Sequence, residues 1–173
     1  MRDVRVPFWS SSGDGAFFAR HGCSVLGWFT QYGRHPISAA VLAARNASEV
    51  EILALRDMIE LEEQILGDAG KLADHNRRFH EAIYYCSHNR YLLKMLAYIQ
   101  TAMLLLQPAG RTGSERRETA LLEHRAVVDA VEARDSAASE AAIRNHVRRA
   151  QQARIKLLLQ MNQSVRLIPS SQD

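Results

Sequence analysis

The feature that most constrains the fold is a helical repeat that carries polar residues on its apolar face, in Lys71–Asn89. The face residues recur at alternating steps of four and three, which is the spacing of one side of an α-helix. They are Leu72, Asn76, Phe79, Ile83 and Cys86. His80 lies on the same side, one turn after Asn76. A buried amide or imidazole without a partner would cost about 1–3 kcal/mol, so other parts of the chain must supply partners.

Helical periodicity and helix-end signals continue through the chain from Pro36 onward. Ser48 and Glu51 have the spacing of a capping box, which predicts that a helix begins there. Asn89 is expected to adopt the left-handed conformation that ends a helix. Asp135 or Ser136 is expected to cap the last helix. These signals predict an all-α fold, an antiparallel helical bundle of about six helices.

The predicted bundle does not extend over the whole chain. Residues 1–34 hold five of the nine glycines and both tryptophans, show no sustained period, and are expected to be irregular. We place the helical bundle at 35–161 and a frayed tail at 162–173, where the apolar period is lost. Arg90–Gln107 is apolar on most sides, as is typical of a central helix or of one buried against a second copy.

Composition limits the classes of function only loosely. The formal charge of +3 and the pI near 9.1 are too weakly basic to argue for nucleic acid binding alone. Two cysteines form neither a disulfide framework nor a zinc-binding cysteine motif, which favours a reducing cytoplasm. No apolar run approaches the roughly 20 residues of a membrane span, so no membrane partner is expected.

Three of the seven histidines lie on the apolar faces of three different predicted helices: His80, His124 and His146. The remaining four do not show that placement: His21, His35, His75 and His88. In an antiparallel bundle the first three imidazoles would converge. Neutral imidazole is a common ligand of zinc, nickel and related ions, and Asn76 could add an amide oxygen. The alternative is a polar core cluster that binds water or an anion.

Three segments carry a resemblance to a known family: NRRFHEAIYYCSHNRYLL, LLEHRAVVDAVEARD and AAIRNHVRRA. Together they resemble the ligand-binding domain of GntR-family transcription regulators of the FCD (FadR C-terminal) type, over about Pro36–Gln160. The resemblance implies an antiparallel helical bundle that holds a divalent metal ion, such as zinc, nickel or manganese, and a small carboxylate metabolite.

Carried over position by position, the resemblance implies a metal site formed by Asn76, His80, His124 and His146. The asparagine is the neutral variant of a position that is also aspartate in the family, so it removes one negative charge from the ligands. Arg34 is matched to an arginine of the first helix that faces the effector pocket. Such regulators bind palindromic DNA as dimers, so a homodimer is expected.

Family members usually carry an N-terminal winged helix-turn-helix, which would need roughly 60–75 residues. Only about 35 residues precede the predicted bundle here, and SGDGAFFAR resembles the glycine-rich tip of a wing. We therefore interpret residues 1–34 as the remnant of a wing and linker, in a truncated or frame-shifted version of a longer regulator. An isolated sensor domain is the alternative. DNA is an expected partner only if the full-length protein contains the winged-helix domain.

The sequence thus predicts the effector-sensing domain of a regulator and not an enzyme. A metal-dependent hydrolase on a helical scaffold is one alternative, because three histidines leave positions open for water. Hydrolysis would also require a carboxylate base, but Glu81 and Glu123 adjoin the histidines in sequence and are expected to point elsewhere. A metal-free structural bundle is the other alternative.

Overall fold

The computed structural model describes residues 34–95 and 113–166, and these are helical apart from short connections. The helices are α3 (Arg34–Asn46), α4 (Glu49–Gln64), α5 (Ala69–Cys86), α7 (Ser114–Glu132) and α8 (Ser136–Arg166). A further helix begins at Arg90 and is described as far as Met95. Within these ranges there is no strand, so the predicted all-α fold is confirmed.

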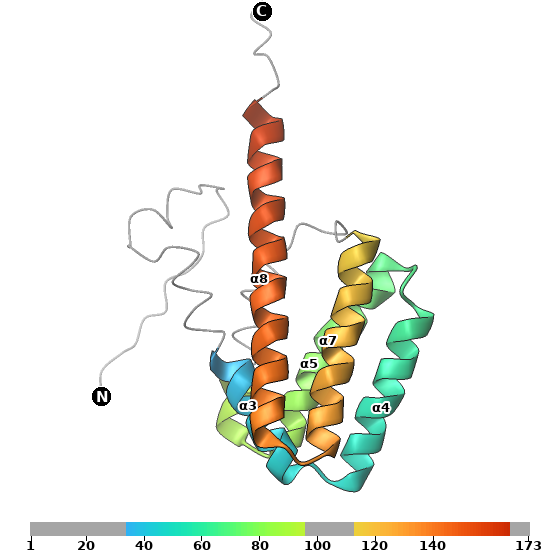
Figure 1. Ribbon diagram of the computed structural model, residues 1–173, viewed down its shortest axis with the longest axis vertical. Coiled ribbons are helices and arrows are strands. Elements are labelled where there is room, and N and C mark those ends of the chain that lie inside the picture. Colours follow the sequence, from blue (N-terminus) through green and yellow to red (C-terminus); the bar gives the residue numbers. More distant parts are fainter. Residues whose placement is uncertain (1–33, 96–112, 167–173) are drawn as a thin grey trace, which may run out of the picture. The chain divides into compact units, whose positions relative to one another are not determined.

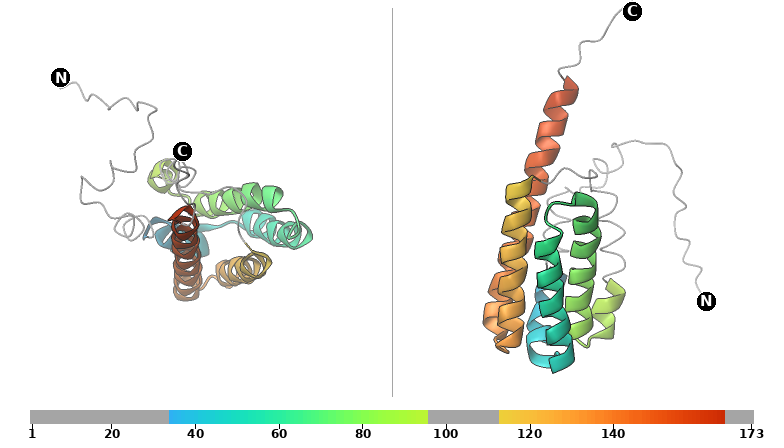
Figure 2. Two further views of the ribbon diagram at one scale, coloured as in Figure 1. Left: turned by 90° about the horizontal axis from the view of Figure 1, so that it is seen from above. Right: turned by 90° about the vertical axis from the view of Figure 1, so that its right-hand side faces the viewer.

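The long helices pack side by side as one bundle (Figure 1). Helices α4 and α5 run in opposite directions, as do α7 and α8, while α3 packs against α5, α7 and α8 at one end. The end-on view in Figure 2 shows α4, α5, α7 and α8 as neighbouring columns. No helix in the described ranges combines the length and the apolar character that crossing a bilayer requires.

Alanines let α3 approach its neighbours closely. Four of them are fully buried on one side of the helix: Ala39, Ala40, Ala43 and Ala44. Ser139 of α8 donates a hydrogen bond of 2.9 Å to the backbone oxygen of Ala40, which fixes the contact between the two helices. The rest of the core comes from larger apolar side chains, chiefly Leu55, Phe79, Ile83, Val128 and Ile143.

Helix ends follow the sequence signals at two of three places. Ser48 and Glu51 form the predicted capping box, and Asp135 accepts hydrogen bonds of 2.9 Å from the backbone N–H groups of Ala137 and Ala138. The prediction for Asn89 is wrong. His88 takes the positive φ of 52°, and Asn89 instead caps the following helix.

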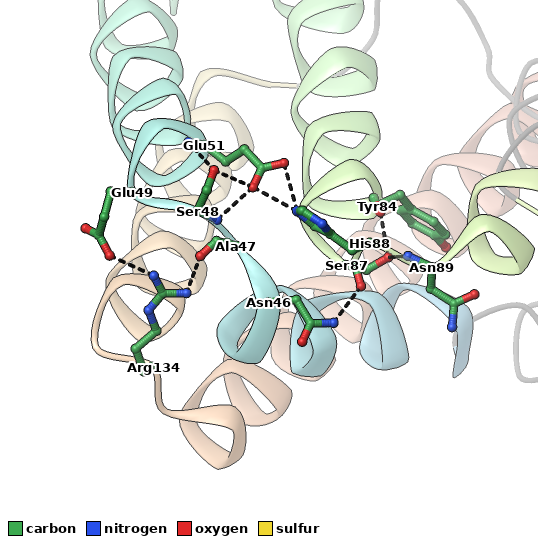
Figure 3. A network of polar contacts seen from close by, with 10 residues as sticks. All are labelled: Asn46, Ala47, Ser48, Glu49, Glu51, Tyr84, Ser87, His88, Asn89 and Arg134. Atoms are coloured by element: carbon green, nitrogen blue, oxygen red, sulfur yellow. Dashed lines mark hydrogen bonds and ion pairs between the residues drawn. The ribbon is translucent and has the colours of Figure 1, made fainter.

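Figure 3 shows why His88 accepts this strained conformation. Its Nε2 lies 2.9 Å from a carboxylate oxygen of Glu51, so the turn after α5 is tied to the start of α4. Close by, Asn46 donates to the backbone oxygen of Ser87, and Arg134 donates to that of Ala47. These polar contacts join three of the connections between helices at one end of the bundle.

Several expectations fall outside the described residues. The chain divides into two units, Met1–Gln31 and Tyr32–Asp173, and every described residue belongs to the second. The expected wing remnant and most of the apolar segment Arg90–Gln107 are therefore not covered. Helix α8 continues to Arg166, into the segment that was expected to fray from residue 162.

Candidate metal centre

Three imidazoles from three helices meet inside the bundle. His80 comes from α5, His124 from α7 and His146 from α8, and one ring nitrogen of each lies within 4.8 Å of the others. The Nε2 atoms of His80 and His146 are 3.2 Å apart. The ring centroids of His124 and His146 are 4.6 Å apart. The structure therefore brings together the three histidines that the helical pattern singled out, a set called the histidine cluster below.

The cluster lies in a largely dry environment. His124 and His146 are buried, and Phe79 stacks on the His124 ring with a centroid separation of 4.3 Å. Burial lowers the pKa of His80 and of His124 well below the ordinary value, and the neighbouring imidazoles lower it further. These two rings therefore stay neutral near neutral pH, which is the form of imidazole that donates a lone pair to a metal ion.

Two buried glutamates contact the histidine cluster at Nδ1 atoms, on the side of the rings away from the shared point. Nδ1 of His124 donates to Glu62 of α4, at 2.8 Å from Oε2, and Nδ1 of His146 donates to Oε2 of Glu123 at 2.9 Å. An ionised carboxylate only accepts hydrogen bonds, so a neutral ring beside one carries its proton on Nδ1 and its lone pair on Nε2. Nε2 of His124 then has no hydrogen-bond partner, and Nε2 of His146 faces that of His80.

Glu123 corrects an expectation from the sequence. It was expected to point away because it adjoins His124, yet it is buried and contacts His146. Arg116 lies 3.0 Å from the same oxygen. Burial alone would raise the pKa of Glu123, but the hydrogen bond from His146 and the charge of Arg116 hold it below the ordinary value.

Glu62 was not singled out from the sequence, and its environment differs from that of Glu123. It is 1% exposed, and burial raises its pKa to about 7 although His75 and His146 oppose the shift. His75 was expected to lie off the buried face, but it is buried, with Nε2 3.8 Å from Oε2 of Glu62. That nitrogen has no hydrogen-bond partner. Glu62 therefore lies between two imidazoles, without a guanidinium or ammonium partner among the described residues.

The other two predicted site residues are less well defined. Asn76 lies one turn before His80 on α5 and is partly exposed, and in the described part of the chain it makes no hydrogen bond to the histidine cluster. Arg34 is the first residue of α3, and its side chain lies outside what the structure describes.

The donor set fits a divalent ion that prefers nitrogen ligands. Nε2 of His124 is buried and has no hydrogen-bond partner, which is costly unless something binds it. Two lone pairs at 3.2 Å repel each other unless a proton or cation lies between them. Two nitrogens bound to one tetrahedral zinc ion at about 2.0–2.1 Å lie about 3.3 Å apart. Neutral imidazoles suit zinc or nickel better than manganese, which prefers oxygen.

Comparisons with known proteins agree with this fold. Residues 37–149 match the family model described as the FCD domain. The uncharacterized HTH-type transcriptional regulator YdhC of Bacillus subtilis (strain 168) is 27% identical over 111 residues, which cover 62% of this chain and 50% of that protein. The chain thus spans about half the length of this relative.

Two solved structures have a similar fold at low sequence identity. Streptococcus agalactiae GntR superposes with a TM-score of 0.61 at 16% identity, over 72% of this chain and 56% of that one. E. coli McbR/YncC superposes with a TM-score of 0.66 at 18% identity, over 77% of this chain and 65% of that one.

Proposed function

The chain belongs to the FCD domain family, and from this premise we propose that it is the effector-sensing domain of a bacterial GntR-type transcription regulator. The observation that carries the proposal is the convergence of three imidazole nitrogens from α5, α7 and α8 on one point of the core. A purely structural bundle would gain nothing from a buried imidazole nitrogen without a partner.

In this proposal His80, His124 and His146 hold a divalent metal ion, with Asn76 as a fourth ligand. Three or four protein ligands leave room for a further donor on the ion. The ion supplies a fixed positive charge to which the oxygen of an organic acid binds. Loss of His80 should weaken metal binding while leaving most of the fold intact, because this ring is only partly buried.

The charges around the cluster favour an anionic effector. Among the described residues, Glu62 and Glu123 contribute at most two negative charges, and Arg116 and Arg149, which both lie beside Glu123, contribute two positive charges. A divalent ion therefore gives the site a net positive charge, which favours a carboxylate as the further ligand. Nη1 of Arg116 is also buried without a hydrogen-bond partner, so it offers a donor to such an anion.

The hydrolase alternative is not supported. The matched family contains domains of transcription regulators and not enzymes. The two carboxylates that contact the histidine cluster accept hydrogen bonds from Nδ1 atoms, on the side of each ring away from Nε2, so neither is placed beside a water molecule bound at the shared point.

We further propose that effector binding changes the packing of the helices or of a homodimer. Where the full-length protein includes a winged-helix domain, this change would alter its affinity for operator DNA. A ligand shifts such an equilibrium only by its difference in affinity for the two states. Ordering of α5, α7 and α8 around one shared ion would provide that difference.

A thermal-shift screen tests the proposal. The full chain is heated with zinc, nickel or manganese, with and without a panel of small mono- and dicarboxylates, and the uncharged amides of the same acids serve as controls. Ligand at about 100 times Kd stabilises by about 2.7 kcal/mol, or roughly 5–10 °C for a chain of this size. We expect an acid to raise Tm only when metal is present. Equal shifts without metal, or none with any acid, would contradict the proposal.

A further inference from the structure

Two glutamates lie behind the histidine cluster, and the role assigned to them below rests on the proposed metal site. Glu62 reaches His124 from α4, and Glu123 reaches His146 from α7. Each accepts a hydrogen bond from Nδ1, and each therefore turns the Nε2 atom of its ring toward the shared point. Outer carboxylates of this kind fix the tautomer and raise the basicity of a metal-binding imidazole.

The proposed metal ligands of this chain, three imidazoles and one amide, carry no formal charge. A histidine binds metal as the neutral imidazole, and Asn76 would supply an amide where a carboxylate would have supplied a negative charge. A divalent cation in a dry site requires nearby negative charge, because burial without it is expensive. Among the described residues, Glu62 and Glu123 are the carboxylates in contact with His124 and His146.

The two glutamates are not equivalent. Arg116 lies 3.0 Å from Glu123, so a guanidinium already balances the charge of that carboxylate. Around Glu62 the described residues place only imidazoles, His124 at 2.8 Å and His75 at 3.8 Å. Among the described residues, no guanidinium or ammonium group balances an ionised Glu62 until a cation enters the histidine cluster.

We propose that Glu62 is the positioning residue that sets metal affinity in this domain, by orienting His124 and by supplying the negative charge that the inner ligands lack. Glu123 orients His146 in the same way but contributes less to affinity, because its charge is already paired with Arg116. Acting through the imidazole, Glu62 does not touch the ion.

The test compares the zinc affinity of the full-length chain with that of three variants, by competition with a chromophoric chelator. Glu62→Gln keeps the size and a hydrogen-bond acceptor but removes the charge. We expect its affinity to fall about 10–100-fold. The zinc affinity of Glu123→Gln should fall by a smaller factor. Glu63→Gln is the matched control, because Glu63 lies next in sequence, is exposed and, within the described ranges, pairs with Arg125.

The melting temperature of the metal-free variants separates this role from a structural one. Removing the unbalanced charge of Glu62 should leave Tm of the metal-free protein unchanged or higher, whereas Glu123→Gln should lower it because Arg116 loses its partner. A lower Tm of metal-free Glu62→Gln with unchanged zinc affinity would overturn the inference. Equal affinity losses in Glu62→Gln and Glu123→Gln would overturn the ranking of the two.

A measurement on the wild-type chain does not depend on how the variants fold. Long-range ¹H–¹⁵N spectra of the zinc-loaded protein should show His124 and His146 protonated at Nδ1 and bound through Nε2. The opposite tautomer would overturn the inference while leaving the metal site intact. Failure of the wild-type chain to bind zinc, nickel or manganese would instead overturn the proposed function as well.

Discussion

His124 shows at the scale of single residues how the candidate site is built. Its side chain is completely buried, one face of the ring stacks on Phe79, and Nδ1 is committed to Glu62. Only Nε2 is left without a partner. Each atom of the ring thus has a defined neighbour except the one that faces His80 and His146.

Asn76 offers a prediction at the same scale. If its side chain is a ligand, Asn76→Asp adds a negative charge to the metal ligands. It should then tighten zinc binding by at least about tenfold, or about 1.4 kcal/mol. Chelator competition measures the change. Asn145→Asp, which makes the same substitution beside His146 on a residue that contacts Arg148, is the control. Equal affinities for wild type and Asn76→Asp would remove Asn76 from the site.

The sequence allowed the three histidines to be predicted but not their outer partners, although a signal for them was present. Glu62 falls in step with Ile52, Leu55 and Ile59 on the buried side of α4. His75 falls equally well in step with Leu72 and Phe79 on α5. Spacing alone does not identify such a carboxylate as buried, because its burial is costly unless a distant residue pairs with it, and that residue cannot be found from local spacing.

At the scale of the helix, the start of α4 depends on Glu51. Burial alone would raise its pKa, but hydrogen bonds from His88 and Ser48 lower it from 4.5 to about 2. Because the pKa is lower in the folded state, this stabilisation is complete above about pH 4.5 and is lost as the pH falls toward 2. The cap and the link to the turn after α5 thus weaken together in acid.

Glu51→Gln should therefore lower the free energy of unfolding by about 1–2 kcal/mol near neutral pH, as expected for loss of a helix cap. The difference from wild type should shrink as the pH falls from about 4.5 toward 2, because the Glu51 carboxylate of the unfolded chain takes up a proton there while folded Glu51 stays ionised. Urea unfolding at several pH values measures it, with exposed Glu60→Gln of the same helix as the control. A difference independent of pH would rule out this role for the Glu51 charge.

The alanine face of α3 gives a second prediction at this scale. Ala43 is fully buried where α3 packs on its neighbours, so Ala43→Leu must push the helices apart and should destabilise the fold by about 1–3 kcal/mol. Ala141→Leu, on the exposed side of α8, should change stability little. Comparable losses of unfolding free energy in both variants would contradict the packing described for α3.

For the whole molecule, the helical pattern from Pro36 onward sufficed to predict an all-α bundle, because heptad-like spacing and end signals are local properties of a helix. Local signals were less exact at the turn Ser87–Asn89. There a contact between distant residues, His88 with Glu51, decides which residue takes the left-handed conformation. The expectations for residues 1–33, 96–112 and 167–173 concern segments outside the described ranges.

The central claim is that residues far apart in the sequence form one metal site, and zinc content tests it most directly. Wild-type chain and His80→Ala are loaded with zinc, dialysed and analysed for metal, while circular dichroism monitors helical content. The account predicts about one zinc ion per wild-type chain, little in His80→Ala, and similar helical content in both. Equal zinc in both proteins, or none in the wild type, would contradict it.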